Sequence, residues 1–157
     1  MGASFHLFSI AMPYPTEFSQ ANDASRAALR ALLAKLNDAQ YKIVLDDDWT
    51  IGSTLAHVAL FDRRALEILK RWELQGVAPS PNDIDMMNAA VLPFLQALAP
   101  ADIARMVIEF ADALDAKLAS LPDTILDQFE TQGGKPFNLL RAKHRNEHIE
   151  QITRAIA

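Results

Sequence analysis

Apolar residues recur along most of this chain at spacings of three and four, which is the period of an α-helix. The spacing predicts long amphipathic helices at residues 20–42, 51–74, 101–122 and 136–156. Residues 82–100 also follow a helical pattern, with a kink or break expected near Pro93. No segment shows convincing period-two alternation, although a short strand pair near residues 126–137 stays open. Four long helices joined by loops indicate an all-α, four-helix bundle.

Polar and conformationally special residues mark the ends of these helices. The run "LDDDWT" interrupts the pattern after the first helix, and we expect Asp46–Asp48 to form a solvated acidic turn. Thr50 follows this turn and is expected to cap the second helix. Residues 123–136 contain a pair of glycines and are expected to form the connection to the last helix.

The length of 157 residues corresponds to about one domain. Residues 1–17 contain two prolines among aromatic and apolar residues, and we predict that they form an extended N-terminal arm. Residues 18–157 are then left as a single bundle domain.

Composition and charge narrow the classes of function. The chain has no cysteine, which excludes disulfides, thiolate zinc sites and cysteine nucleophiles. A formal net charge of −5 gives no electrostatic basis for binding nucleic acid or an anionic membrane. No apolar run has the length of a transmembrane helix, and the first residues lack the basic start of a secretory signal. We therefore expect a cytoplasmic protein that binds neither nucleic acid nor membrane.

The chain has four histidines, and two of them, His144 and His148, lie four residues apart in "RAKHRNEHIEQITRAIA". At about 100° of rotation per residue, both rings project within ~40° of each other on the last helix. Leu140 and Ile152 flank the same face, which must therefore enter the core. The histidine pair is predicted to point inward.

His57 lies at the border of the apolar seam of the second helix, within ~40° of Phe61. In a bundle it can face the last helix across the interior. Two histidines one turn apart can chelate a divalent transition metal, and a third from a facing helix leaves coordination positions open for water or substrate. Imidazole ligands suit zinc, nickel, copper or iron. The candidate ligands of this site are His57, His144 and His148.

The same pattern has a second interpretation, in which the protein is a non-catalytic helical module and its histidines are buried polar residues. An inward histidine is most often a core residue satisfied by a hydrogen bond. In a chain of this composition, the chance expectation of a His-x-x-x-His pair is on the order of 0.1. A metal that only stabilises the fold is a third interpretation.

Other polar residues are candidates for the surroundings of the site. Arg141 lies within ~20° of His148 and could hold an anionic substrate group beside the metal, or extend its guanidinium to the rim. Asp62 and Arg64, close to His57 in sequence, could line the pocket or belong to a solvated helix face.

Four segments resemble the DinB/YfiT-like superfamily. "DDDWTIGSTLAHVALFDRR" is similar to the Trp-to-His segment that opens the family's second helix, and "AKHRNEHIEQI" is similar to its closing His-x-x-x-His followed by Gln-Ile. "NDIDMMNAAV" and "ADIARMVIEFADALDAKLASLPDTIL" resemble the stretch between them. The likeness covers roughly residues 20–156, and the order and spacing of the motifs carry it.

The resemblance implies an up-down-down-up bundle, usually a homodimer, with a divalent metal held by three histidines. By position, His57, His144 and His148 match the family's ligands. Relatives use such a metal, with zinc or nickel expected here, to activate a low-molecular-weight thiol, and others are metal-dependent hydrolases. The resemblance therefore implies a thiol S-transferase acting on a small molecule in detoxification or stress response, with a metal-dependent hydrolase as the alternative.

Overall fold

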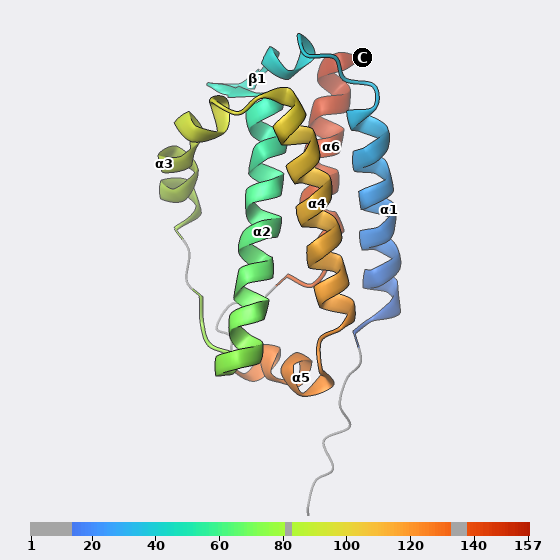
Figure 1. Cartoon of the computed structure of the whole chain (residues 1–157), viewed down its shortest axis with the longest axis vertical. Coiled ribbons are helices and arrows are strands. Elements are labelled where there is room, and N and C mark those ends of the chain that lie inside the picture. The colour runs from blue at the N-terminus through green and yellow to red at the C-terminus, as the bar shows by residue number, and fades with distance from the viewer. Residues whose placement is uncertain (1–13, 81–82, 133–137) are drawn as a thin grey trace, which may run out of the picture.

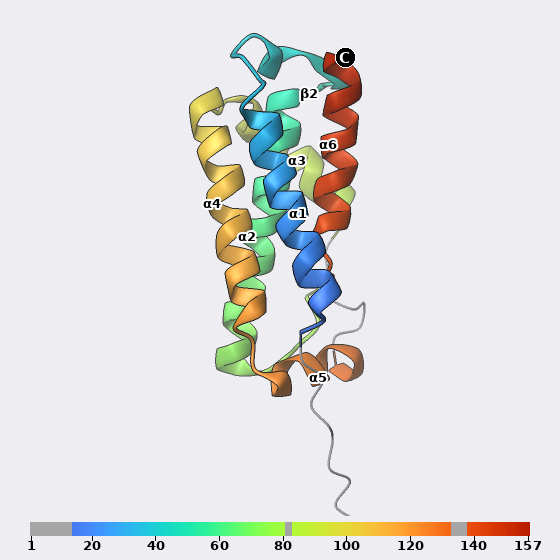
Figure 2. The same cartoon turned by 90° about the vertical axis from the view of Figure 1, so that its right-hand side faces the viewer.

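A computed structural model describes residues 14–80, 83–132 and 138–157. Its long helices lie side by side as a bundle (Figures 1 and 2): α1 (Thr16–Leu33), α2 (Ile51–Gln75), α4 (Pro100–Ala119) and α6 (Ala142–Ile156). Helices α1 and α6 run toward the end of the bundle where the chain terminates, and α2 and α4 run the opposite way (Figure 1). The prediction of an all-α fold is confirmed.

Shorter elements close the two ends of the bundle. A 3₁₀ helix, η1 (Gln40–Lys42), and a two-stranded hairpin of β1 (Val44–Asp46) and β2 (Trp49–Thr50) lie at the end that carries the C terminus. Helix α5 (Asp123–Gln132) crosses the other end, and α3 (Ile84–Gln96) packs on the outside of α2 (Figure 1).

Two apolar clusters fill the interior. On α2, residues 51–59 contribute to one cluster and residues 65–72 to the other, and the fully buried Asp62 lies between them. On α4, Asp115 is buried near the junction of the same two clusters. The buried side chains of Asp62 and Asp115 thus form a polar layer between the two apolar clusters.

The first predicted helix is shorter than expected at its C-terminal end. Helix α1 ends at Leu33 rather than near residue 42. The side chain of Asn37 accepts hydrogen bonds from the backbone N–H groups of Ala39 and Gln40, each at 3.1 Å. A side chain that binds its neighbouring backbone competes with the helical pattern, so the chain turns here and restarts as η1.

The acidic run after this turn forms a hairpin that the sequence did not predict. Val44 pairs with Thr50, and Asp46 pairs with Trp49. Asp47 adopts a φ of 45°, a left-handed conformation that Asp tolerates in tight turns. The predicted acidic turn is therefore present, but it is the tip of a hairpin with strands too short to show alternation.

The predicted connection at residues 123–136 was wrong over most of its length. Residues 123–132 form α5, because the Pro122 carbonyl accepts from the N–H groups of Ile125 and Leu126 and both side chains bury into the core. The possible strand pair near residues 126–137 is contradicted over 126–132, which are helical, and the remainder lies outside the described residues. The last helix begins at Ala142 rather than near residue 136.

The predicted N-terminal arm, residues 1–17, falls mostly outside the described residues. Helix α1 begins at Thr16, two residues before the expected domain boundary.

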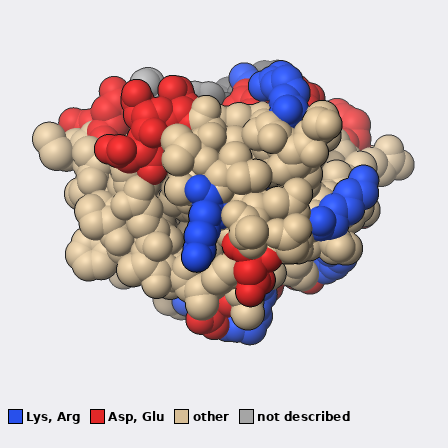
Figure 3. Space-filling view, turned by 90° about the horizontal axis from the view of Figure 1, so that it is seen from above, with Lys and Arg blue, Asp and Glu red and all other residues tan. Residues whose placement is uncertain are grey.

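Within the described ranges, none of the helices combines the length and apolar character needed to cross a bilayer. Viewed from above, acidic side chains form one larger group at the upper left, and elsewhere acidic and basic side chains are scattered over a largely uncharged surface (Figure 3).

Candidate metal centre

The first histidine of the centre, His57, is fixed by the most enclosed part of α2. The helix starts with a capping box, in which Thr50 Oγ1 accepts from the Ser53 N–H at 3.1 Å and Ser53 Oγ accepts from the Thr50 N–H at 2.9 Å. This satisfies two backbone donors that a helix start leaves free, and it confirms Thr50 as the cap. Every residue from 51 to 59 is buried, and His57 is only 8% exposed.

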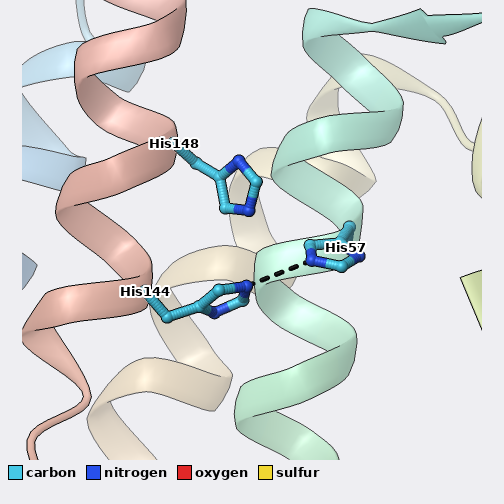
Figure 4. Close-up of side chains that lie close together, drawn as sticks. All are labelled: His57, His144 and His148. Atoms are coloured by element: carbon cyan, nitrogen blue, oxygen red, sulfur yellow. Dashed lines mark hydrogen bonds between the residues drawn. The ribbon is translucent and has the colours of Figure 1, made fainter. Parts of the chain in front are cut away.

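The other two histidines lie one turn apart on α6. His144 and His148 are both half-buried, and their rings point from α6 toward His57 on α2 (Figure 4). Lys143, Glu147 and Glu150 lie on the exposed face of the same helix. The structure therefore orients the pair inward, as the 3.6-residue period predicts.

The three rings converge closely enough to share one ion. His57 Nε2 and His144 Nε2 are 3.1 Å apart, and the ring centroids of His57 and His148 are separated by 5.1 Å. One ligand nitrogen from each ring lies within 4.8 Å of the others. Nitrogens bound tetrahedrally at ~2.1 Å to one metal would stand roughly 3.4 Å apart. Small ring rotations would bring the described set to that spacing.

The tautomer of His148 follows from its neighbour Gln151. His148 Nδ1 lies 3.1 Å from Gln151 Oε1, and a carbonyl oxygen can only accept, so Nδ1 must carry the proton. The Nε2 of His148 is then an unprotonated acceptor. Gln151 thus prepares one ligand nitrogen for a metal, in the manner of outer residues around metal sites.

Burial keeps the other two rings neutral. Burial, with a smaller contribution from His148, lowers the pKa of His57 to about 4. The pKa of His144 is lowered to about 3, mainly by burial and also by the neighbouring His148, His57, Arg141 and Arg145. A neutral imidazole is the form that binds a metal, so both rings are competent ligands at neutral pH.

The residues fit a divalent cation on the chemistry of the donors and on their unmet bonding. The Nε2 atoms of His57 and His144 lie 3.1 Å apart, and without an ion one of them must carry a proton to bond the other. Three neutral nitrogens face one another, and their protons cannot satisfy every pair. An ion that accepts electron pairs from all three would resolve this arrangement.

Aromatic side chains form an apolar wall around His57. Trp49 meets the ring edge-on with centroids 5.5 Å apart, and Phe61 lies at 4.6 Å from His57 and 5.6 Å from His144. Such a wall restricts water and strengthens electrostatic interactions at the centre.

The position of Arg141 contradicts one of the two interpretations considered from the sequence, the extension to the rim. It is buried rather than extended to the rim, and its Nε and Nη2 donate to Asp62 Oδ1 at 3.2 and 3.1 Å. The charge of Arg141 lowers the pKa of His144, so it still contributes positive potential at the centre. A direct contact with an anionic substrate group stays a prediction.

Asp62 and Arg64, which the sequence placed together as candidates near His57, make different contacts in the structure. Asp62 is fully buried, which contradicts a solvated helix face, and it holds Arg141 and Arg145 together. Arg64 is half-buried and donates to the backbone carbonyl and the hydroxyl of Ser80, at 3.3 and 3.2 Å.

Sequence reasoning missed Arg145, which is fully buried in this region, as Asp62 is. Its Nε donates to Asp62 Oδ2 at 2.8 Å, and its terminal nitrogens donate to Asp115 at 2.7 and 3.0 Å. One signal was available: Arg145 lies seven residues before the buried Ile152, which places both on one helical face.

A family model described as the DinB superfamily matches residues 21–152, which is most of the chain. The chain belongs to the DinB superfamily. Comparison of this DinB protein with functionally curated proteins gave no significant match. A comparison with solved structures likewise gave no significant match. Family membership therefore supports the helical fold and a metal-binding role, and the reaction must be argued from the site itself.

Proposed function

We propose that this DinB protein is a metal-dependent enzyme that transfers a low-molecular-weight thiol to a small electrophilic molecule. The observation that carries the proposal is the convergence of His57, His144 and His148 from two helices. Three neutral ligands leave further coordination positions open to a substrate, which is typical of catalytic rather than structural sites. We expect zinc or nickel as the ion and detoxification or stress response as the setting.

The charges around the centre favour an anionic ligand. Two permanently charged groups, Arg141 and Arg145, act on His144, and both are cationic. When bound, a divalent metal would lower the pKa of a thiol or water molecule and so supply a nucleophile at neutral pH. The protein holds the ligands neutral, excludes water with Trp49 and Phe61, and adds positive potential.

In the proposed transfer, the thiol releases its proton to solvent and its sulfur forms a bond to the electrophilic carbon. The bond from that carbon to the leaving group breaks, and the leaving group keeps the electron pair. No redox partner is required. The family's homodimer and the small-molecule substrate stay predictions alongside this chemistry.

The experiment is a thiol-conjugation assay with untagged protein, measured before and after loading with zinc or nickel. Small thiols are combined with a chromogenic halide electrophile, and His148→Ala is compared with Glu147→Ala, an exposed neighbour on α6. We expect a metal-dependent rate that His148→Ala abolishes and Glu147→Ala retains. A metal-loaded protein that conjugates no thiol would contradict the transferase.

A metal-dependent hydrolase is the second candidate, because the same open positions admit water. Its support is that the three histidines do not distinguish a sulfur ligand from an oxygen ligand. Hydrolysis of an activated ester by the same two variants separates the candidates. A metal-dependent ester rate without thiol conjugation would favour the hydrolase.

A further inference from the structure

The start of helix α6 has no cap from its own segment of the chain. The helix begins at Ala142, and the residue at the cap position, Arg141, makes no side-chain hydrogen bond to the helix start. The first N–H groups of a helix have no partner inside the helix, and Ser, Thr, Asp or Asn just before it usually supplies one. His144 is the third residue of α6 and lies in this first turn. The placement of one candidate ligand therefore depends on how the first turn is held.

The missing partner comes from helix α1, which lies beside α6 (Figure 2). Asn22 Oδ1 accepts from the Ala142 N–H at 2.7 Å, and Asn22 Nδ2 donates to the Leu139 carbonyl at 3.1 Å. One side chain thus bonds the backbone on both sides of the point where the chain enters α6. These contacts fix the orientation of the amide, because the N–H must meet its oxygen and the carbonyl must meet its nitrogen.

Asn22 is enclosed and its amide is fully paired. The residue is 1% exposed, and Nδ2 donates its second proton to Tyr14 Oη at 2.8 Å. A buried amide costs stability unless it is hydrogen-bonded, so this side chain belongs here only because of the bonds that it makes. Removing it would leave the Ala142 N–H and the Leu139 carbonyl without this partner in the interior.

A second set of contacts holds the same turn through side chains. Arg141 and Arg145 of α6 both donate to Asp62 on α2. These contacts act through long side chains, whereas Asn22 bonds the backbone itself. Loss of the Asn22 amide should therefore loosen the first turn of α6 without detaching α6 from α2.

We propose that Asn22 is a positioning residue of the metal centre, which caps α6 from α1 and thereby holds His144 opposite His57. This inference rests on the proposed metal site. The Nε2 atoms of His144 and His57 are 3.1 Å apart, and a shift of the first turn would change this spacing directly. His148 lies one turn further along and has its own partner in Gln151, so its placement should not depend on Asn22.

The first test is zinc affinity, measured by competition with a chromogenic chelator. Asn22→Ala should weaken binding roughly 5- to 30-fold, the upper part of the range for losing a helix cap, and Asn22→Asp should restore most of it because a carboxylate also accepts from the Ala142 N–H. Val107→Ala is the control, since it removes only packing from a buried position on α4. An Asn22→Ala affinity within about twofold of the wild type would overturn the proposal.

The second test needs no metal and distinguishes a local role from general destabilisation. In amide hydrogen exchange of the metal-free protein, the Ala142 N–H should be protected in the wild type and in Val107→Ala. In Asn22→Ala, exchange should become faster at residues 142–145 than at residues 148–152. Failure of the wild type to bind zinc would reject the metal site, whereas an unprotected Ala142 N–H in the wild type would reject the role of Asn22.

Discussion

Asp62 is the most informative residue to remove, because it holds two buried arginines in place. Its carboxylate is fully buried and accepts two hydrogen bonds from Arg141, at 3.2 and 3.1 Å, and one from Arg145, at 2.8 Å. In Asp62→Ala, Arg141 loses these bonds and Arg145 keeps only Asp115 as its carboxylate partner. Breaking a buried pair by removing one side costs about 3–5 kcal/mol, because the remaining charge is left uncompensated.

Thermal and urea unfolding measure this cost. For a chain of this size, 1 kcal/mol corresponds to roughly 2–4 °C in Tm, so Asp62→Ala should lower Tm by about 6–20 °C. Asp112→Ala is the control: Asp112 pairs with Arg26 and Arg30, but its side chain is 39% exposed. Exposed pairs contribute about 1 kcal/mol or less. If Asp62→Ala and Asp112→Ala lowered Tm by the same small amount, the conclusion that Asp62 stabilises two buried arginines would be refuted.

Three further predictions concern the histidines and the start of α2. The pKa of His144 is lowered to about 3 in the folded protein, so the unfolded chain binds a proton first as the pH falls below 6.5. Stability should therefore fall from pH 6.5 toward pH 3, by up to about 1.4 kcal/mol per pH unit for this ring. Urea unfolding of wild type and His144→Asn at several pH values isolates the effect, because the other groups titrate in both. Gln151→Ala removes the acceptor of His148 Nδ1–H and should weaken zinc binding about 10- to 100-fold by chelator competition. Thr50→Ala removes the capping box of α2 and should cost about 0.5–2 kcal/mol in urea unfolding, without changing zinc affinity.

The inward direction of the histidines could be predicted from the sequence because it is a local property. A helical period sets the direction of each side chain relative to its neighbours, and α2 and α6 are regular over the segments that carry His57, His144 and His148. The same reasoning identified Thr50 as a cap, since capping is also decided within a few residues.

The partners of the buried charges could not be predicted in this way. Arg145 lies on α6, Asp62 on α2 and Asp115 on α4, so their contacts depend on how three helices pack. Single-helix periodicity identifies a buried face but not the residue opposite it.

The missed secondary structure has a different cause. Strands β1 and β2 contain too few residues for alternation to appear, and their pairing is decided by the left-handed turn at Asp47. The segment that forms α5 was predicted to be a connection because two glycines follow it. Its apolar residues Ile125 and Leu126 are buried in the core, and this burial was not predicted. Tertiary burial overrode the local expectation in that segment.

The central claim is tested most directly by the metal content of untagged protein that has been loaded with zinc or nickel and then dialysed. Elemental analysis should find one divalent ion per chain in the wild type and none retained in His148→Ala, with both proteins folded by circular dichroism. A wild type that retains no ion, or a His148→Ala variant with unchanged metal content, would contradict the three-histidine centre.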